Sequence, residues 1–189
     1  GLIAREAVKI ISQQKDNDKP FFLTVGFKKP HLPFNAPKKY WDMYEESEIP
    51  LAPNQYHPEN SPSYSTNHYA LANYAGLNYY NSPNHVLPDD YQRKLIHAYA
   101  ACISYIDAQV GKLITTLKET GKYDNTIIVF ISDHGWHLGH QQQWGKTTNF
   151  ENSTRAPLIV SSPNHKKGKR STQLVEYVDL YATLCDLTD

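Results

Sequence analysis

The sequence has little cysteine, no surplus of charge of either sign and no long apolar run. Its 189 residues include only two cysteines, Cys102 and Cys185, without C-x-x-C spacing, so neither a zinc site nor a disulfide framework is indicated. We expect both to be small buried hydrophobic residues. Nineteen acidic and nineteen basic residues balance, which gives no general attraction to nucleic acid or to an anionic membrane. No apolar run approaches the ~20 residues of a membrane span, and the first residues lack a signal-peptide pattern.

Strand-like and helix-like segments alternate along the chain, which predicts an α/β domain. Residues 20–27 form a short continuous apolar run that is typical of a strand covered on both faces. Further strands are expected at residues 126–132 and 156–163. Helices are expected at residues 1–14, from Pro88 to Gly121, and in the last residues, where Leu180, Leu184 and Leu187 recur at helical spacing.

A long irregular region, residues 28–88, separates the first expected strand from the long helix. It is rich in Pro, Asn, Ser and Tyr, and a loop of this length is either disordered or a functional cover over a site. Aromatic residues are scarce in disordered tracts. We therefore favour a cover.

Asp133 and His134 follow directly on the apolar run at residues 126–132. A lone Asp at a strand end is often a turn former or a helix cap. Here His134 is adjacent, and Gly135 permits a tight turn or a close backbone approach. Such a pair can ligate a divalent cation, with calcium or magnesium favoured by a carboxylate-rich set and zinc by an imidazole-rich one. Two ligands are too few, so others are expected from elsewhere.

A second polar cluster follows the first expected strand, where His31 stands between Pro30 and Pro33. Taken alone, it is also consistent with a solvated basic turn. If both strand ends share one sheet edge, the loops bring His31, Lys146, Asp133 and His134 to a common crevice. Positive groups and an imidazole suit an anionic ester, because the cations neutralise charge and the imidazole protonates a departing alkoxide.

Five motifs, in this order and spacing, resemble the type I sulfatases of the alkaline phosphatase superfamily, and most of all their iduronate-2-sulfatase branch. They are KPFFLTVGFKKPHLPF, YIDAQVGKLI, NTIIVFISDHGWHLG, WGKTTNFENSTRAPLIV and LVEYVDLYATL. The resemblance implies an alkaline phosphatase-like α/β sandwich, with a largely parallel central sheet flanked by helices that is incomplete in this chain. Residues 1–189 then represent the middle and C-terminal portion of a sulfatase catalytic domain, with the 28–88 loop inside it.

The resemblance also implies roles for individual residues. Asp133 and His134 match the pair that ligates calcium, Lys146 matches a lysine that binds sulfate oxygens, and His31 matches a histidine placed to protonate the leaving oxygen. Glu151 and Arg155 match an acid and a base of the motif. We interpret these last two as a structural ion pair, because their spacing places them on one helical face.

Several family features are absent from this sequence. Type I sulfatases use a formylglycine made from Cys or Ser in a Cys/Ser-x-Pro/Ala-x-Arg signature, and neither Cys102 nor Cys185 lies in one. The N-terminal aspartates that complete the calcium site are also missing. We expect these elements in a segment upstream of Gly1, so the chain alone is expected to be inactive and to need that segment as its partner.

The expected activity of the whole protein is release of inorganic sulfate from a sulfated carbohydrate, in the manner of the iduronate-2-sulfatase branch. Trp136, His137 and His140 either line the carbohydrate pocket or are packing and surface residues. The alternatives are a phosphatase or phosphodiesterase of the same superfamily, and a non-catalytic relative that binds sulfated glycans. By the same resemblance, the protein is expected to be secreted, periplasmic or lysosomal.

Overall fold

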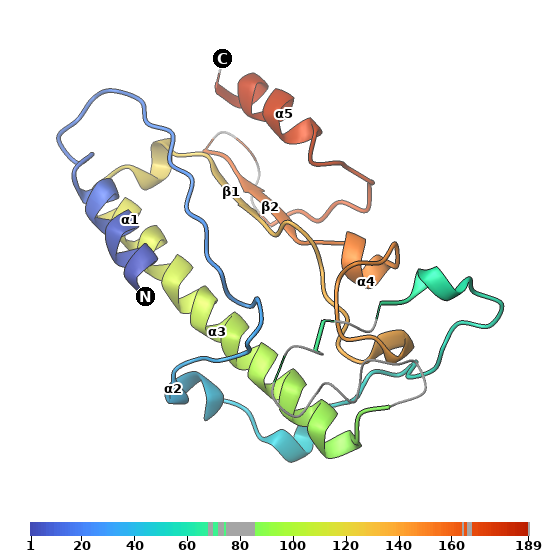
Figure 1. The fold of residues 1–189 in the computed structure, drawn as a ribbon. Coiled ribbons are helices and arrows are strands. Elements are labelled where there is room, and N and C mark those ends of the chain that lie inside the picture. Colours follow the sequence, from blue (N-terminus) through green and yellow to red (C-terminus); the bar gives the residue numbers. More distant parts are fainter. Residues whose placement is uncertain (68–69, 72–73, 75–85, 164, 166–167, 189) are drawn as a thin grey trace.

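A computed structural model of the chain describes residues 1–67, 70–71, 74, 86–163, 165 and 168–188 (Figure 1). The described helices are α1 (Leu2–Ser12), α2 (Lys38–Trp41), α3 (Asp89–Glu119), α4 (Glu151–Thr154) and α5 (Asp179–Thr188). The strands are β1 (Ile128–Ile131) and β2 (Leu158–Ser161). Single 3-10 turns occur at Glu46–Glu48, Ser63–Ser65, Tyr123–Asn125 and His140–Gln142. None of the described helices combines the length and apolarity needed to span a bilayer.

The long helix α3 is the scaffold of the fold, and its sequence explains both of its ends. Two acidic residues, Asp89 and Asp90, lie in the first turn, where negative charge complements the helix dipole. At the other end Gly121 adopts φ +70°. The amides of Gly121 and Lys122 donate to the carbonyls of Lys118 (3.1 Å) and Leu117 (2.9 Å), which is a Schellman cap. The predicted helix is thus confirmed, and α1 and α2 pack against it.

The strands β1 and β2 pair antiparallel, with Ile128 opposite Ser161 and Ile131 opposite Leu158. The expected α/β class is confirmed, and in the view of Figure 1 the strands lie between α3 and α5. The expectation of parallel strands does not hold for this pair. A parallel pair needs a crossover connection, usually a helix. Residues 132–157 contain a 3-10 turn and the one-turn α4 but no crossover helix, and they return to the same end of the strand pair.

The strand expected at residues 20–27 does not form in this structure. The segment is extended and its side chains alternate between partly buried and exposed, but it pairs with no strand of the described chain. Its Phe22 side chain is 87% exposed. The apolar pattern predicts a strand covered on both faces, and this prediction is wrong for this structure because a strand needs a hydrogen-bonding neighbour.

The long loop is partly structured. Residues 38–41 form α2, and Leu32, Leu71, Leu87 and Trp144 make a buried cluster. Since Trp144 belongs to the loop between β1 and β2, this part of the long loop packs against that loop, and its role as a cover over a site stays a prediction. The expectation for residues 68–69, 72–73 and 75–85 lies outside the described residues.

The two cysteines differ in their surroundings. Cys102 is fully buried on α3, as expected. Cys185 is exposed on α5, so the prediction that it is buried is wrong for this structure. The helical spacing of apolar residues predicts the helix itself, but it does not show which face of α5 packs against other residues.

Candidate functional site

The loop between β1 and β2 carries most of the predicted site residues. Asp133 and His134 follow β1 directly, and Lys146 lies further along the same loop. Because β2 runs antiparallel to β1, the loop begins and ends at the same end of the strand pair. The amide of Gly135 donates to the carbonyl of Ser153, 2.7 Å away, which closes the loop near its base.

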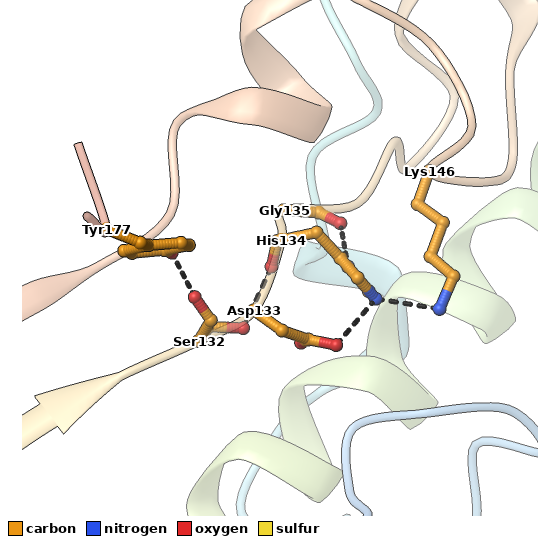
Figure 2. A network of polar contacts seen from close by, with 6 residues as sticks. All are labelled: Ser132, Asp133, His134, Gly135, Lys146 and Tyr177. Carbon is orange, nitrogen blue, oxygen red and sulfur yellow. Dashed lines mark hydrogen bonds and ion pairs between the residues drawn. The ribbon is translucent and has the colours of Figure 1, made fainter.

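Asp133, His134 and Lys146 come together at the end of β1 (Figure 2). The Nδ1–H of His134 donates to the carbonyl of Gly135 at 2.8 Å. This bond leaves the lone pair on Nε2, which accepts a hydrogen bond from Lys146 Nζ at 2.7 Å. Asp133 Oδ2 lies 3.4 Å from the same Nε2. A carboxylate, an imidazole lone pair and an ammonium therefore converge on one point.

Two neighbouring contacts hold this turn in place. Ser132 Oγ donates to the carbonyl of His134 at 2.8 Å, and the Tyr177 hydroxyl donates to the carbonyl of Ser132. Desolvation, and secondly the Asp133 carboxylate, raise the pKa of Tyr177. The phenol therefore keeps its proton for this bond. Sequence reasoning missed Tyr177, since no local pattern links it to a strand end 45 residues away.

Gly135 is required by the close approach of another backbone segment. A Cβ at this position would lie 2.1 Å from the carbonyl oxygen of Asn152 and 3.0 Å from its carbonyl carbon. The expected close backbone approach is therefore confirmed. It brings the amino end of α4 against the Asp133–His134 turn.

His137 is buried inside the loop and forms hydrogen bonds with two other parts of it. Its side chain is fully buried; Nδ1–H donates to the carbonyl of His140 at 3.3 Å, and Nε2 accepts from Thr148 Oγ1 at 3.0 Å. Thr148 Oγ1 in turn lies 3.0 Å from the Ser153 hydroxyl. Burial, as the largest cause, lowers the pKa of His137, which favours this neutral form. His137 is enclosed by these contacts among the described residues, which agrees with packing, one of the two roles considered from sequence. The partners Thr148 and Ser153 were also missed.

Trp136 and His140 are half-buried. The Trp136 ring packs edge-on against Phe34, with ring centroids 5.9 Å apart. Trp136 Nε1 and His140 Nδ1 are buried atoms that have no hydrogen-bond partner among the described residues. Desolvation lowers the pKa of His140. Both residues stand where the loop meets the long cover.

His31 lies on the exposed surface of the long loop. Its Nδ1–H donates to the carbonyl of Leu32 at 2.8 Å, and Lys29 Nζ donates to its carbonyl at 3.3 Å. The structure shows no contact of His31 with Asp133, His134 or Lys146 within the described residues. The neighbouring Leu32 and Phe34 nevertheless pack against Trp144 and Trp136, so the two loops adjoin.

Glu151 and Arg155 form the predicted ion pair, with Arg155 Nη1 3.4 Å from Glu151 Oε1. Both side chains are more than three-quarters exposed, so the pair contributes little to stability. The ion pair lies just before β2, and the structural role expected for it stays a prediction.

The residues at the end of β1 fit half of a cation site. A metal-binding histidine usually donates its second ring N–H to a carbonyl or carboxylate, as His134 does to Gly135. The Lys146 ammonium occupies the Nε2 lone pair in this structure, so an ion bound by His134 and Asp133 would displace it from that position. No group of three or more His, Cys, Asp or Glu side chains that could hold a metal occurs among the residues that the structure describes. Asp133 and His134 therefore need further ligands to hold an ion.

The whole chain is similar to known sulfatases. Residues 2–189 match the family model described as Sulfatase. Iduronate 2-sulfatase of Mus musculus is 34% identical over 211 residues, which cover 96% of this chain and 38% of the mouse protein. The chain thus spans little more than a third of the length of this relative.

Solved structures show the same relationship. A crystal structure of the Bacteroides fragilis protein yidJ has a TM-score of 0.71 and 30% identity, covering 98% of this chain and 36% of that chain. The structure of Ps i-CgsB in complex with k-i-k-neocarrahexaose has a TM-score of 0.65 and 26% identity, covering 98% and 33%. A phosphonate monoester hydrolase from Silicibacter pomeroyi has a TM-score of 0.62 and 27% identity, covering 85% and 33%.

Proposed function

Because the chain belongs to the sulfatase family, we propose that it is the middle and C-terminal portion of a catalytic domain that releases inorganic sulfate from a sulfated carbohydrate. One observation carries the proposal: Lys146 Nζ lies 2.7 Å from His134 Nε2, beside Asp133, at the end of a strand. Cationic and metal-ligating groups at one strand end suit a doubly anionic transition state. The similarity to iduronate 2-sulfatase and to a protein solved with an oligosaccharide supports a sugar substrate.

In this proposal each residue has a distinct task. Lys146 neutralises sulfate oxygens, while Asp133 and His134 supply two ligands of a calcium ion. His31 in its doubly protonated form gives the Nε2 proton to the departing sugar oxygen, while its Nδ1–H stays bonded to the Leu32 carbonyl. Trp136 and His140 remain candidates for substrate contact, because both are partly exposed beside the cover.

Two further groups complete the chemistry. A formylglycine supplies the nucleophile and calcium neutralises charge on the sulfate; both depend on residues that we place in an upstream segment of the same protein. On this proposal the 189-residue chain alone does not turn over, and the whole protein is secreted, periplasmic or lysosomal.

The proposal is tested on the intact protein with a chromogenic aryl sulfate and with sulfated disaccharides. Lys146→Ala and His31→Ala are each expected to lower kcat/KM by about 100-fold or more, the scale of a lost general acid or anion-stabilising group. Lys169→Ala and His165→Ala are matched controls, since both side chains are exposed on the segment after β2. Unchanged turnover in the Lys146 and His31 variants would exclude these roles.

A second candidate function is supported by the likeness to a phosphonate monoester hydrolase. The same cationic strand end suits phosphate or phosphonate esters. Parallel assays with 4-nitrophenyl sulfate, phosphate and phenylphosphonate separate the two by their kcat/KM values. A protein that binds sulfated glycans by calorimetry but hydrolyses none of these esters is a non-catalytic relative instead.

A further inference from the structure

The chain exposes far more surface than a compact protein of its mass. Its accessible area is 13163 Å², whereas a folded monomer of 21.6 kDa exposes about 9,200 Å². The surplus of about 4,000 Å² is on the scale of the total area buried in permanent protein interfaces. A large part of this surface is therefore built for contact.

The strand pair contributes apolar side chains on both faces. Phe130 and Ile159 face each other across the ladder and are 37% and 59% exposed, while Ile131 and Val160, on the opposite face, are 44% and 41% exposed. Seven of the eight paired residues are apolar, and none is buried. Strands that are apolar on both faces normally lie inside an α/β sheet with layers on both sides.

Helix α5 shows the same feature. Its inner positions Leu180, Leu184 and Leu187 are partly buried. On another face Tyr181 is 81% exposed, and Val178, just before the helix, is 78% exposed. Cys185 follows one turn after Tyr181 and is exposed. Asp179, Thr183 and Asp186 form the polar face of α5, so its apolar residues cover a wider arc than the single stripe of a typical surface helix.

One contact joins these two regions: the Tyr177 hydroxyl ties the segment before α5 to the carbonyl of Ser132, just after β1. We call the exposed side chains of β1, β2 and α5 the apolar surface, defined by Phe130, Ile131, Ile159, Val160, Val178 and Tyr181. Extended residues 20–27, with Phe22 87% exposed, offer a further unpaired backbone edge.

We propose that the apolar surface is an internal packing face, and that its occupant is the remaining polypeptide of the same protein. The length of the relatives identifies the occupant, because the chain spans 38% of the mouse enzyme and 33–36% of the similar structures named above. A free strand edge accepts a further strand of the same sheet. The inference rests on the proposed function only in requiring a larger domain.

The native thiols provide a test that needs no substitution. Cys185 is exposed and Cys102 is fully buried in this structure. In the isolated 189-residue chain, maleimide is expected to modify Cys185 quickly and Cys102 only after denaturation. In the intact gene product Cys185 is expected to react at least tenfold more slowly. Equal reactivity of Cys185 in the two proteins overturns the proposal.

Light scattering on the isolated chain distinguishes the other occupant, a second copy. A monomer with a reactive Cys185 is expected. A stable dimer in which Cys185 is protected shows instead that the surface is a contact between two copies, and so overturns the assignment to the remaining polypeptide.

A matched pair of variants tests the strand face itself. Ile159→Asp and Met43→Asp place a carboxylate at positions that are 59% and 63% exposed here, so both are expected to change the isolated chain little. In the intact protein Ile159→Asp is expected to reduce the soluble folded yield or lower the melting temperature, while Met43→Asp is not. Equal effects overturn the proposal. None of these readouts depends on turnover, so a failed sulfatase assay leaves this result interpretable.

Discussion

Replacing Gly135 by alanine places a methyl group against a backbone that cannot rotate away. The added Cβ would lie 2.1 Å from the Asn152 carbonyl oxygen and 3.4 Å from that of Arg155. Relief requires separation of the Asp133–His134 turn from the segment before β2. That movement also lengthens the 2.7 Å hydrogen bond from the Gly135 amide to the Ser153 carbonyl.

The magnitude follows from two contributions. Overpacking of a closely packed position costs about 1–3 kcal/mol, and a weakened hydrogen bond costs about 1 kcal/mol. We expect Gly135→Ala to lower the free energy of unfolding by about 3 kcal/mol. Gly111→Ala is the matched control, since its Cβ would meet nothing within 4 Å on the exposed side of α3. Alanine's better helix propensity should raise stability there by about 0.5–1 kcal/mol.

Urea unfolding followed by tryptophan fluorescence measures both changes, because Trp136 and Trp144 lie in the same loop. With a denaturant slope of about 2 kcal/mol/M, Gly135→Ala lowers the midpoint by about 1.5 M and Gly111→Ala raises it by about 0.4 M. If the free energies of unfolding of Gly135→Ala and of the unchanged protein differ by less than about 0.5 kcal/mol, the close approach to Asn152 does not constrain this loop. The same Gly→Ala change is thus expected to lower the free energy of unfolding at position 135 and to raise it at position 111.

Two further predictions concern the same loop. Burial lowers the pKa of His137. The neutral ring therefore makes its full contribution to the free energy of unfolding above the unfolded-state pKa of about 6.5. This contribution is lost as the pH falls below that value. Urea midpoints at pH 7.5 and 5.5 should therefore differ less in His137→Asn than in the unchanged protein, and an equal or larger difference refutes the assignment. Glu151→Gln removes an exposed ion pair and should change stability by at most about 0.5 kcal/mol; a loss above 1.5 kcal/mol by the same assay would show that Glu151 has a further partner.

The sequence predicted those elements whose signals are local. Both ends of α3 and the strands β1 and β2 agree with expectation. Lys146 meets His134 beside Asp133, but the described residues show no contact of His31 with this group. The hydrophobic pattern at residues 20–27 predicted a strand but could not supply the neighbouring strand that makes it part of a sheet. Likewise, no spacing rule reveals that His137 bonds Thr148, because hydrogen-bond partners across a loop depend on how the loop closes.

Loop closure explains why one half of the site is assembled here and the other is not. The antiparallel return of β2 fixes both ends of residues 132–157, so Asp133, His134 and Lys146 meet through contacts within this one loop. His31 follows residues 20–27, which pair with no strand among the described residues, and Leu32 and Phe34 pack its turn against Trp144 and Trp136. A strand that pairs with residues 20–27 would fix the direction in which His31 leaves the sheet. The position of the proposed general acid therefore depends on a strand outside the described residues, whereas Asp133, His134 and Lys146 meet without one.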